Sequence, residues 1–220
     1  MTVEENPLRP EHFLRVDEDD DAAFYAAPRL VTHIDDAAIE AATRFYRDLL
    51  PPGGRILDLM SSWISHLPDD VAFASVTGLG MNAVELSANP RLTRWTVHDL
   101  NADPILPYGD GEFDAAVVTV SVQYLVRPVE VFAEVGRVLN AGGPFAVLYS
   151  DRCFPTKAVA AWHALDLRGR AELIGLYFRL SGRFGPARAY DLSPAPGQSD
   201  PLIAVVAEAV ATPDEELRRA

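Results

Sequence analysis

Short apolar runs alternate with amphipathic segments along most of this chain, from residue 35 to residue 210. The apolar runs, several of them rich in β-branched residues, predict strands over 55–59, 71–76, 94–97, 113–120, 144–149, 187–192 and 202–210. Helices are expected over 35–50, 82–89, 128–141 and 157–181, the last of these broken around 168–169. The alternation therefore predicts an α/β fold, a mainly parallel seven-strand sheet with helices on both faces.

In such a sheet the ligand lies at the carboxyl ends of the strands, near the point where the strand order reverses. Polar or small residues occur at the ends of successive expected strands, and they are Asp58, Gly80, Asp99, Ser121, Ser150 and Asp151. We expect these residues to gather at one edge of the sheet and to form the binding site.

Residues 1–34 differ from the rest of the chain. Residues 1–21 hold eight acids and two arginines, which is typical of a solvated arm. Residues 1–34 also carry Phe13, Leu14, Phe24 and Tyr25, which is too much apolar surface for a free tail. We expect one domain over 1–220, in which 1–34 is an arm or lid that packs on an α/β core over 35–220.

Charge and cysteine content narrow the function classes. The net charge of −13 disfavours a general nucleic-acid binder, which needs a basic face. The single cysteine, Cys153, allows no internal disulfide and no cysteine cluster for a metal, and it fits a reducing compartment. The start of the chain is not typical of a secretory signal and no run is long enough for a membrane span, so a cytoplasmic location is expected.

Several short motifs occur in an informative order. They are Asp99-Leu100-Asn101, Leu106-Pro107-Tyr108, Phe113-Asp114-Ala115-Ala116-Val117 and a run over 134–143 that ends in Gly142-Gly143. In this order they resemble the class I S-adenosylmethionine-dependent methyltransferases, which have a Rossmann-like fold. The strings LDLMSSWISHLP (57–68) and DRCFPTKA (151–158) are similar to an uncharacterised methyltransferase-like family. The resemblance implies S-adenosylmethionine as cofactor and methyl transfer as the reaction. The acidic charge balance and the lack of an added recognition domain favour a small-molecule substrate.

The resemblance also implies roles for individual residues. Asp58 would orient the methionine end of the cofactor, Asp99 and the backbone N–H of Leu100 would meet the adenine, and the carbonyl of Ser121 would receive the methionine ammonium. Two positions depart from the family pattern. The glycine loop after the first strand is replaced by a loop that contains Ser61 and Ser62, and Gly80 stands where an acid usually binds the ribose, with Asn82 as the nearest polar substitute.

An oxygen nucleophile needs a base within hydrogen-bond reach. The candidates are His33, His66, Tyr124 and Asp151, although a lone histidine is more often structural than catalytic. The altered loop and Gly80 also keep a second hypothesis open. In that hypothesis the chain is a non-catalytic protein with the methyltransferase fold that binds a nucleoside-like ligand or a protein partner.

Overall fold

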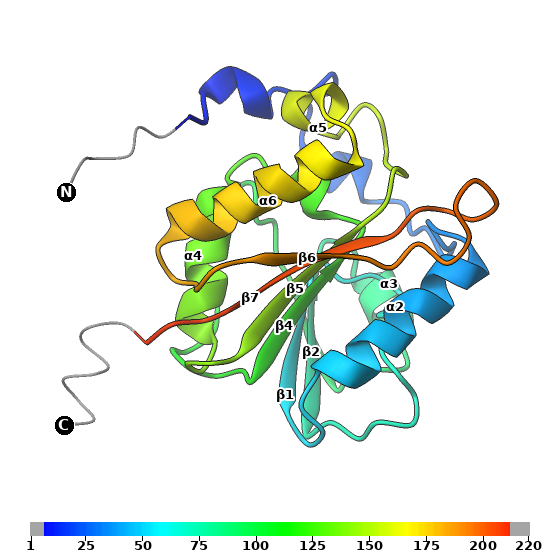
Figure 1. The fold of residues 1–220 in the computed structure, drawn as a ribbon, viewed down its shortest axis with the longest axis vertical. Coiled ribbons are helices and arrows are strands. Elements are labelled where there is room, and N and C mark those ends of the chain that lie inside the picture. Colours follow the sequence, from blue (N-terminus) through cyan, green and yellow to red (C-terminus); the bar gives the residue numbers. More distant parts are fainter. Residues whose placement is uncertain (1–6, 212–220) are drawn as a thin grey trace.

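The computed structural model describes residues 7–211 and contains one seven-stranded sheet (Figure 1). In chain order the strands are β1 (Arg55–Leu59), β2 (Ser75–Gly80), β3 (Arg94–Val97), β4 (Ala115–Thr119), β5 (Pro144–Tyr149), β6 (Arg188–Asp191) and β7 (Ile203–Glu208). Their spatial order is β3-β2-β1-β4-β5-β7-β6. The first five strands pair in parallel, whereas β7 runs antiparallel to β5 and β6. The predicted fold class is confirmed.

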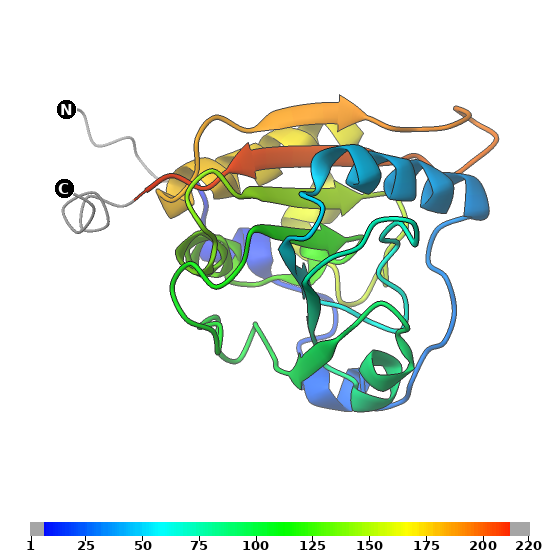
Figure 2. The same ribbon diagram turned by 90° about the horizontal axis from the view of Figure 1, so that it is seen from below.

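Helices cover both faces of the sheet, as Figures 1 and 2 show. The main helices are α2 (Asp36–Leu49), α3 (Ala83–Ala88), α4 (Pro128–Val138), α5 (Ala160–Ala164) and α6 (Leu167–Ser181). Successive strand residues point to opposite faces, so neighbours such as Ile56 and Leu57 enter different cores. Ile56 packs with α2, and Leu57 packs with α4 and α6. Burial on both faces explains why these strands read as continuous apolar runs.

Two expected elements are displaced. The strand predicted over 71–76 is β2, which begins only at Ser75. Residues 72 and 74 instead form backbone hydrogen bonds with Gly53 and Gly54, so this apolar stretch is a connection and not part of the sheet. The helix predicted over 157–181 is interrupted as expected, but the break lies at residues 165–166 and not around 168–169, because Asp166 accepts a hydrogen bond from the Gly169 N–H and so caps the start of α6.

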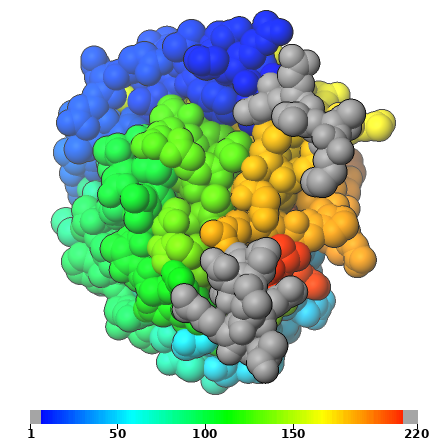
Figure 3. Space-filling view, turned by 90° about the vertical axis from the view of Figure 1, so that its left-hand side faces the viewer, coloured from blue at the N-terminus to red at the C-terminus, as the bar shows by residue number. Residues whose placement is uncertain are grey.

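The arm, here the described residues 7–34, contains two short helices that the sequence analysis did not predict. They are a 3-10 turn, η1 (Pro10–Phe13), and α1 (Asp21–Phe24). The side chain of Asp20 accepts from the Ala22 N–H and so caps α1. Figure 3 shows the arm in blue as a band along one end of the molecule.

Candidate functional site

A cavity that opens to solvent lies at the carboxyl edge of the sheet and under the arm. It is lined by every expected cofactor residue, namely Asp58, Ser61, Ser62, Gly80, Asn82, Asp99, Leu100 and Ser121. His33, His66 and Tyr124 also line it. Asp151 does not, which corrects the expectation that it faces the site. Its carboxylate is exposed to solvent and lies 4.0 Å from the Arg152 guanidinium.

Asp58, the fourth residue of β1, is a carboxylate that is only 3% exposed. The hydroxyls of Ser61 and Ser65 both donate to its Oδ2, each at 2.6 Å. Its Oδ1 therefore remains available as an acceptor on a residue that lines the cavity. Among the described residues no cationic side chain pairs with this acid, and burial raises its pKa to about 6. A cation placed in the cavity would relieve that burial cost.

The loop after β1 folds back onto the end of β2. The Ser61 N–H donates to the Leu79 carbonyl at 2.7 Å. The Ser61 carbonyl oxygen lies 2.1 Å from the point that a Cβ on Gly80 would occupy. Residue 80 is therefore a glycine because the loop backbone takes that space, and an acid cannot stand there without moving the loop.

Glu85 and Asn82, both from the start of α3, are the polar groups beside Gly80. Glu85 Oε2 accepts from the Ser62 hydroxyl at 2.5 Å. The Asn82 side chain is fully engaged, since its Oδ1 accepts from the Val84 and Glu85 N–H groups and its Nδ2 donates to the carbonyls of Tyr25 and Ala26. Asn82 thus joins α3 to the arm, and Glu85 is the carboxylate left near the expected ribose position.

At the end of β3 the Asp99 carboxylate both closes a turn and faces the cavity. Its Oδ1 accepts from the N–H groups of Asn101 and Ala102, at 2.8 and 3.3 Å. Leu100 is buried next to it. At the end of β4 the Ser121 carbonyl accepts from the Tyr124 N–H at 3.1 Å, so one of its lone pairs is in use.

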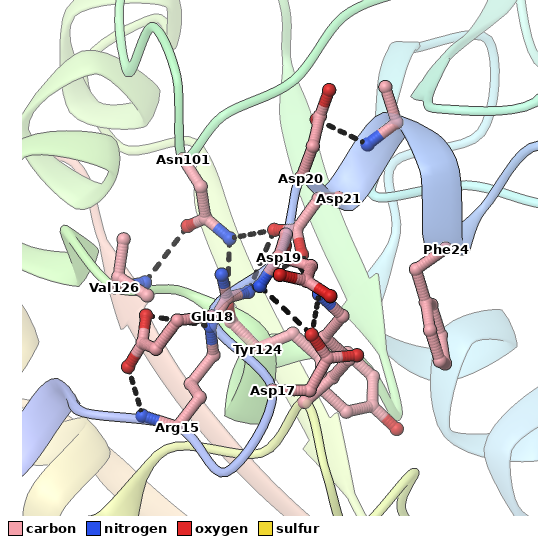
Figure 4. Close-up of polar contacts among 12 residues, drawn as sticks. Arg15, Asp17, Glu18, Asp19, Asp20, Asp21, Phe24, Asn101, Tyr124 and Val126 are labelled. Atoms are coloured by element: carbon pink, nitrogen blue, oxygen red, sulfur yellow. Dashed lines mark hydrogen bonds and ion pairs between the residues drawn. The ribbon is translucent and has the colours of Figure 1, made fainter.

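A buried ion-pair cluster fixes the start of the arm (Figure 4). Asp21 is the first residue of α1. Arg15 Nη1 donates to both of its carboxylate oxygens, at 2.8 Å each, and Lys157 forms an ion pair with it at 3.0 Å. Lys157, the only lysine, is fully buried and also pairs with Asp17 at 3.2 Å. Asn101 Nδ2 donates to Asp21 at 2.8 Å, which connects the arm to the loop after β3.

The second half of the arm is held over the cavity by main-chain contacts. The backbone N–H of Arg29 donates to Glu85 Oε1 at 2.6 Å. The backbone carbonyl of Val31 accepts from Trp63 Nε1 at 2.9 Å. With the two carbonyls bound by Asn82, the arm is attached to the loop after β1, to α3 and, through Asp21, to the loop after β3.

His66 is the more buried of the two candidate histidines, with 8% exposure. Its backbone has φ of +56°, and its Nδ1 has no hydrogen-bond partner among the described residues. Burial lowers its pKa to about 4, so the imidazole is neutral near pH 7. Tyr124 is also buried, its hydroxyl accepts from the Phe154 N–H at 2.8 Å, and burial raises its pKa to about 12. His33 lies edge-on to Phe154 at 5.2 Å.

The cavity residues that were absent from the sequence-based list of site residues include Tyr25, Arg29 and Phe154. The available signals were the apolar residues inside the acidic arm and the string DRCFPTKA, which contains Phe154. Neither signal showed which cavity wall these residues form, because their placement depends on contacts far apart in sequence.

Comparison with protein families gives one match within the chain. A family described as a methyltransferase domain matches residues 61–147, which run from the loop after β1 into β5. This range contains the ends of β2, β3 and β4, where most of the cavity residues lie. No curated protein matches the sequence.

Many solved structures share the fold. A TehB-like SAM-dependent methyltransferase from Corynebacterium glutamicum has a TM-score of 0.54 and 17% identity, covering 77% of this chain and 87% of that one. Geranyl diphosphate C-methyltransferase from Streptomyces coelicolor, solved with S-adenosyl-L-homocysteine, has a TM-score of 0.51 and 16% identity, covering 78% and 77%. The [4+2]-cyclase SpnF has a TM-score of 0.60 and 17% identity, covering 87% and 92%. At such identities the similarity establishes the fold.

Proposed function

We propose that this chain is a class I S-adenosylmethionine-dependent methyltransferase, which transfers a methyl group to a small-molecule acceptor by direct displacement. The observation that carries the proposal is Asp58, a buried carboxylate with no cationic partner among the described residues and one oxygen available toward the cavity. S-adenosylmethionine presents an ammonium group, which is the kind of partner that this carboxylate lacks.

The other cavity residues suit the nucleoside end of the cofactor. Asp99 Oδ2 is the acceptor for the adenine amino group, and Leu100 lies beside it. Glu85 takes the place of the missing acid at Gly80 as the acceptor for ribose hydroxyls, with Ser62 next to it. The Streptomyces enzyme was solved with S-adenosyl-L-homocysteine, which supports the same cofactor class for this fold.

Bound S-adenosylmethionine supplies an electrophilic methyl group, whose bond to sulfur breaks as the bond to the acceptor forms. The chain's part is mainly to hold the acceptor in line, and positioning of this kind is worth ~7–11 kcal/mol. A hydroxyl acceptor also loses a proton, and the imidazoles of His66 and His33 line the cavity and can accept it. Tyr124 also lines the cavity, but burial raises its pKa to about 12, so its hydroxyl is protonated near pH 7 and cannot take that proton. Asp151 has no place in this proposal because it lies outside the cavity.

The arm is part of the proposed site. Residues 1–34 act as a lid whose described part lies over the cavity, and 35–220 form the core. We also propose the cytoplasm as the location, since the only cysteine, Cys153, is free. No helix among residues 7–211 is long and apolar enough to cross a membrane.

A second candidate function is binding without methyl transfer. The filled space at Gly80 and the engaged Asn82 side chain favour it, because both remove usual contacts to the cofactor. SpnF, described as a [4+2]-cyclase, shows that this fold also occurs in a protein named for a different reaction. Such a protein would bind a nucleoside-like ligand or a protein partner.

Thermal unfolding with S-adenosylhomocysteine tests the cofactor class. A ligand at a hundredfold excess over its Kd stabilises the folded state by ~2.7 kcal/mol, which raises the Tm of a domain of this size by about 5–11 °C. NAD, ATP and adenosine lack the amino-acid end and should shift the Tm much less. Ser62→Leu narrows the cavity and should abolish the shift.

Ser87→Leu is the matched control, because Ser87 is exposed on α3 and does not line the cavity. This variant should keep the full shift. An unchanged Tm of the unmodified protein at millimolar S-adenosylhomocysteine would refute the cofactor proposal. A normal shift without methyl turnover on any acceptor would instead favour the second function.

A further inference from the structure

Arg29 is the only arginine or lysine among the described residues that line the cavity. The other charged groups there are the acids Asp21, Asp58, Glu85 and Asp99. Asp21 is already neutralised by Lys157 and Arg15. The guanidinium of Arg29, by contrast, has no carboxylate within ion-pair distance among the described residues, although the backbone N–H of the same residue binds Glu85.

The guanidinium is held in position by aromatic rings and by one good hydrogen bond. Its Cζ lies 4.6 Å from the ring centre of Phe24, 5.3 Å from that of Phe154 and 5.8 Å from that of Tyr25. Its Nη2 donates to the Phe24 carbonyl at 2.9 Å, and the contact from Nη1 to the Ala27 carbonyl is long, at 3.4 Å. A guanidinium has five N–H donors, so most of them remain available for an anion.

Flat side chains surround this cation. Phe154 and Tyr124 are stacked with 27° between their ring planes and 5.8 Å between their ring centres, and both line the cavity. Tyr25 and Trp63 add two more aromatic surfaces. Phe154 is fixed by the hydrogen bond from its N–H to the Tyr124 hydroxyl, and the arm is fixed by Asn82 and Glu85. The cation and the flat walls therefore form a rigid set.

We propose that Arg29 selects the acceptor, and that the acceptor is a flat molecule carrying an anionic group, which Arg29 binds while the ring packs against Phe154 and Tyr124. This proposal rests on the proposed function, because a methyl acceptor exists only if the chain is a methyltransferase. A carboxylate and a phosphate share the chemistry that a guanidinium recognises. Both accept paired, charge-assisted hydrogen bonds, so both belong in the test.

Calorimetric titration of the full chain with simple probes tests this selection. The probes are benzoate, phenyl phosphate, neutral benzamide and the non-planar cyclohexanecarboxylate, each with and without saturating S-adenosylhomocysteine. The two aromatic anions should bind at least about tenfold more tightly than benzamide, as one charge-assisted hydrogen bond would give. Benzoate should also bind more tightly than cyclohexanecarboxylate. The stronger of the two anions identifies the natural group.

Variants assign the preference to Arg29. Arg29→Gln should abolish the discrimination between benzoate and benzamide and leave S-adenosylhomocysteine binding unchanged, whereas Arg29→Lys should keep part of it. Arg9→Gln makes the same change at an exposed position of the arm, outside the cavity, and should have no effect. Unmodified protein that binds benzoate and benzamide equally would overturn the inference, even if Arg29→Gln failed to fold.

Persistence of the preference in a folded Arg29→Gln variant would also overturn the inference. The two proposals fail separately. Loss of S-adenosylhomocysteine binding with an intact anion preference would remove the methyltransferase function and leave the anion site standing. Normal S-adenosylhomocysteine binding without any anion preference would remove the anion site and leave the methyltransferase function standing.

Discussion

Three residues other than glycine have positive φ angles among the described residues, and all three line the cavity. They are Met60 at +54°, His66 at +56° and Val120 at +49°. This conformation is unfavourable for side chains with a Cβ and most unfavourable for a β-branched residue such as Val120. Strained backbone of this kind persists where surrounding contacts impose it, and it concentrates at functional sites. The strained backbone therefore supports placing the functional site at this edge of the sheet.

Gly80 offers a prediction at the scale of one residue. Gly80→Ala puts a Cβ 2.1 Å from the Ser61 carbonyl oxygen, so the loop after β1 must move. We expect this variant to lose about 1–3 kcal/mol of unfolding free energy, as overpacked sites do. Urea unfolding measures the loss.

Gly175→Ala, in the middle of α6, is the control for Gly80→Ala. Its new Cβ meets nothing within 4 Å, and alanine is the better helix former. This variant should be as stable as the unmodified protein or slightly more stable. Equal stability of Gly80→Ala and Gly175→Ala would contradict the close approach of Ser61 to Gly80.

At the scale of elements the sequence predicted the sheet well, because parallel strands buried on both faces leave long apolar runs such as 144–149. It failed where an apolar run had another use. Residues 71–74 read like a strand, but they pair with the turn at Gly53 and Gly54. Local pattern measures apolarity and does not show which partner a segment meets.

The candidate site was predictable only in its strand-end half. Asp58 and Asp99 follow from strand order and from the resemblance, since the ends of parallel strands meet at one edge. Arg29 and Phe154 do not, because the arm reaches the cavity through partners far away in sequence. Arg29 meets Glu85 across 56 positions, and Lys157 meets the carbonyl of Asp19 across 138.

The arm itself carries the next prediction. Lys157→Met keeps most of the buried side chain but leaves Asp17 and Asp21 without their ammonium partner. Removing one member of a buried ion pair typically costs ~3–5 kcal/mol. We expect the arm to detach, which limited proteolysis within residues 7–34 and increased binding of a hydrophobic dye would detect.

An exposed ion pair provides the comparison for Lys157→Met. Arg47→Met removes the cation that pairs with Asp70 on the surface, where such pairs contribute about 0–1 kcal/mol. This variant should keep the arm protected from protease. If Lys157→Met were cleaved no faster than Arg47→Met, the ion-pair cluster would not be what holds the arm.

On the scale of the whole molecule, the sheet separates two cores and opens at one edge. Leu57 and Leu59 belong to the core under α4 and α6, while Ile56 belongs to the core under α2. Asp58 shares the face of Ile56 and is the one acid in β1. The fold thus gives up some stability in exchange for a buried carboxylate at the site, which is a frequent arrangement in binding sites.

That exchange should appear in the pH dependence of unfolding. The Asp58 pKa is about 6 in the folded state against an ordinary value of 3.8, so the folded state binds the proton more tightly than the unfolded chain. The stability from this proton is fully present below about pH 3.8 and is lost as the pH rises through 6. At pH 7.5 the ionised Asp58 therefore costs on the order of 3 kcal/mol relative to a solvated carboxylate.

Asp58→Asn isolates this effect, because asparagine keeps the size and carries no charge. The variant should be about 1–3 kcal/mol more stable than the unmodified protein at pH 7.5, and this advantage should shrink between pH 6 and pH 4. Asp114, whose pKa the adjacent Arg55 guanidinium lowers to about 2, titrates below that window in both proteins and cancels in the comparison. Denaturant titrations at a series of pH values measure the difference.

The same variant should lose S-adenosylhomocysteine binding. In the unmodified protein the affinity for S-adenosylhomocysteine should fall as the pH drops below 6, because a protonated Asp58 no longer attracts the ammonium. A constant stability difference across pH 4–7.5, together with undiminished binding by Asp58→Asn, would show that this carboxylate is neither strained by burial nor used for the ligand.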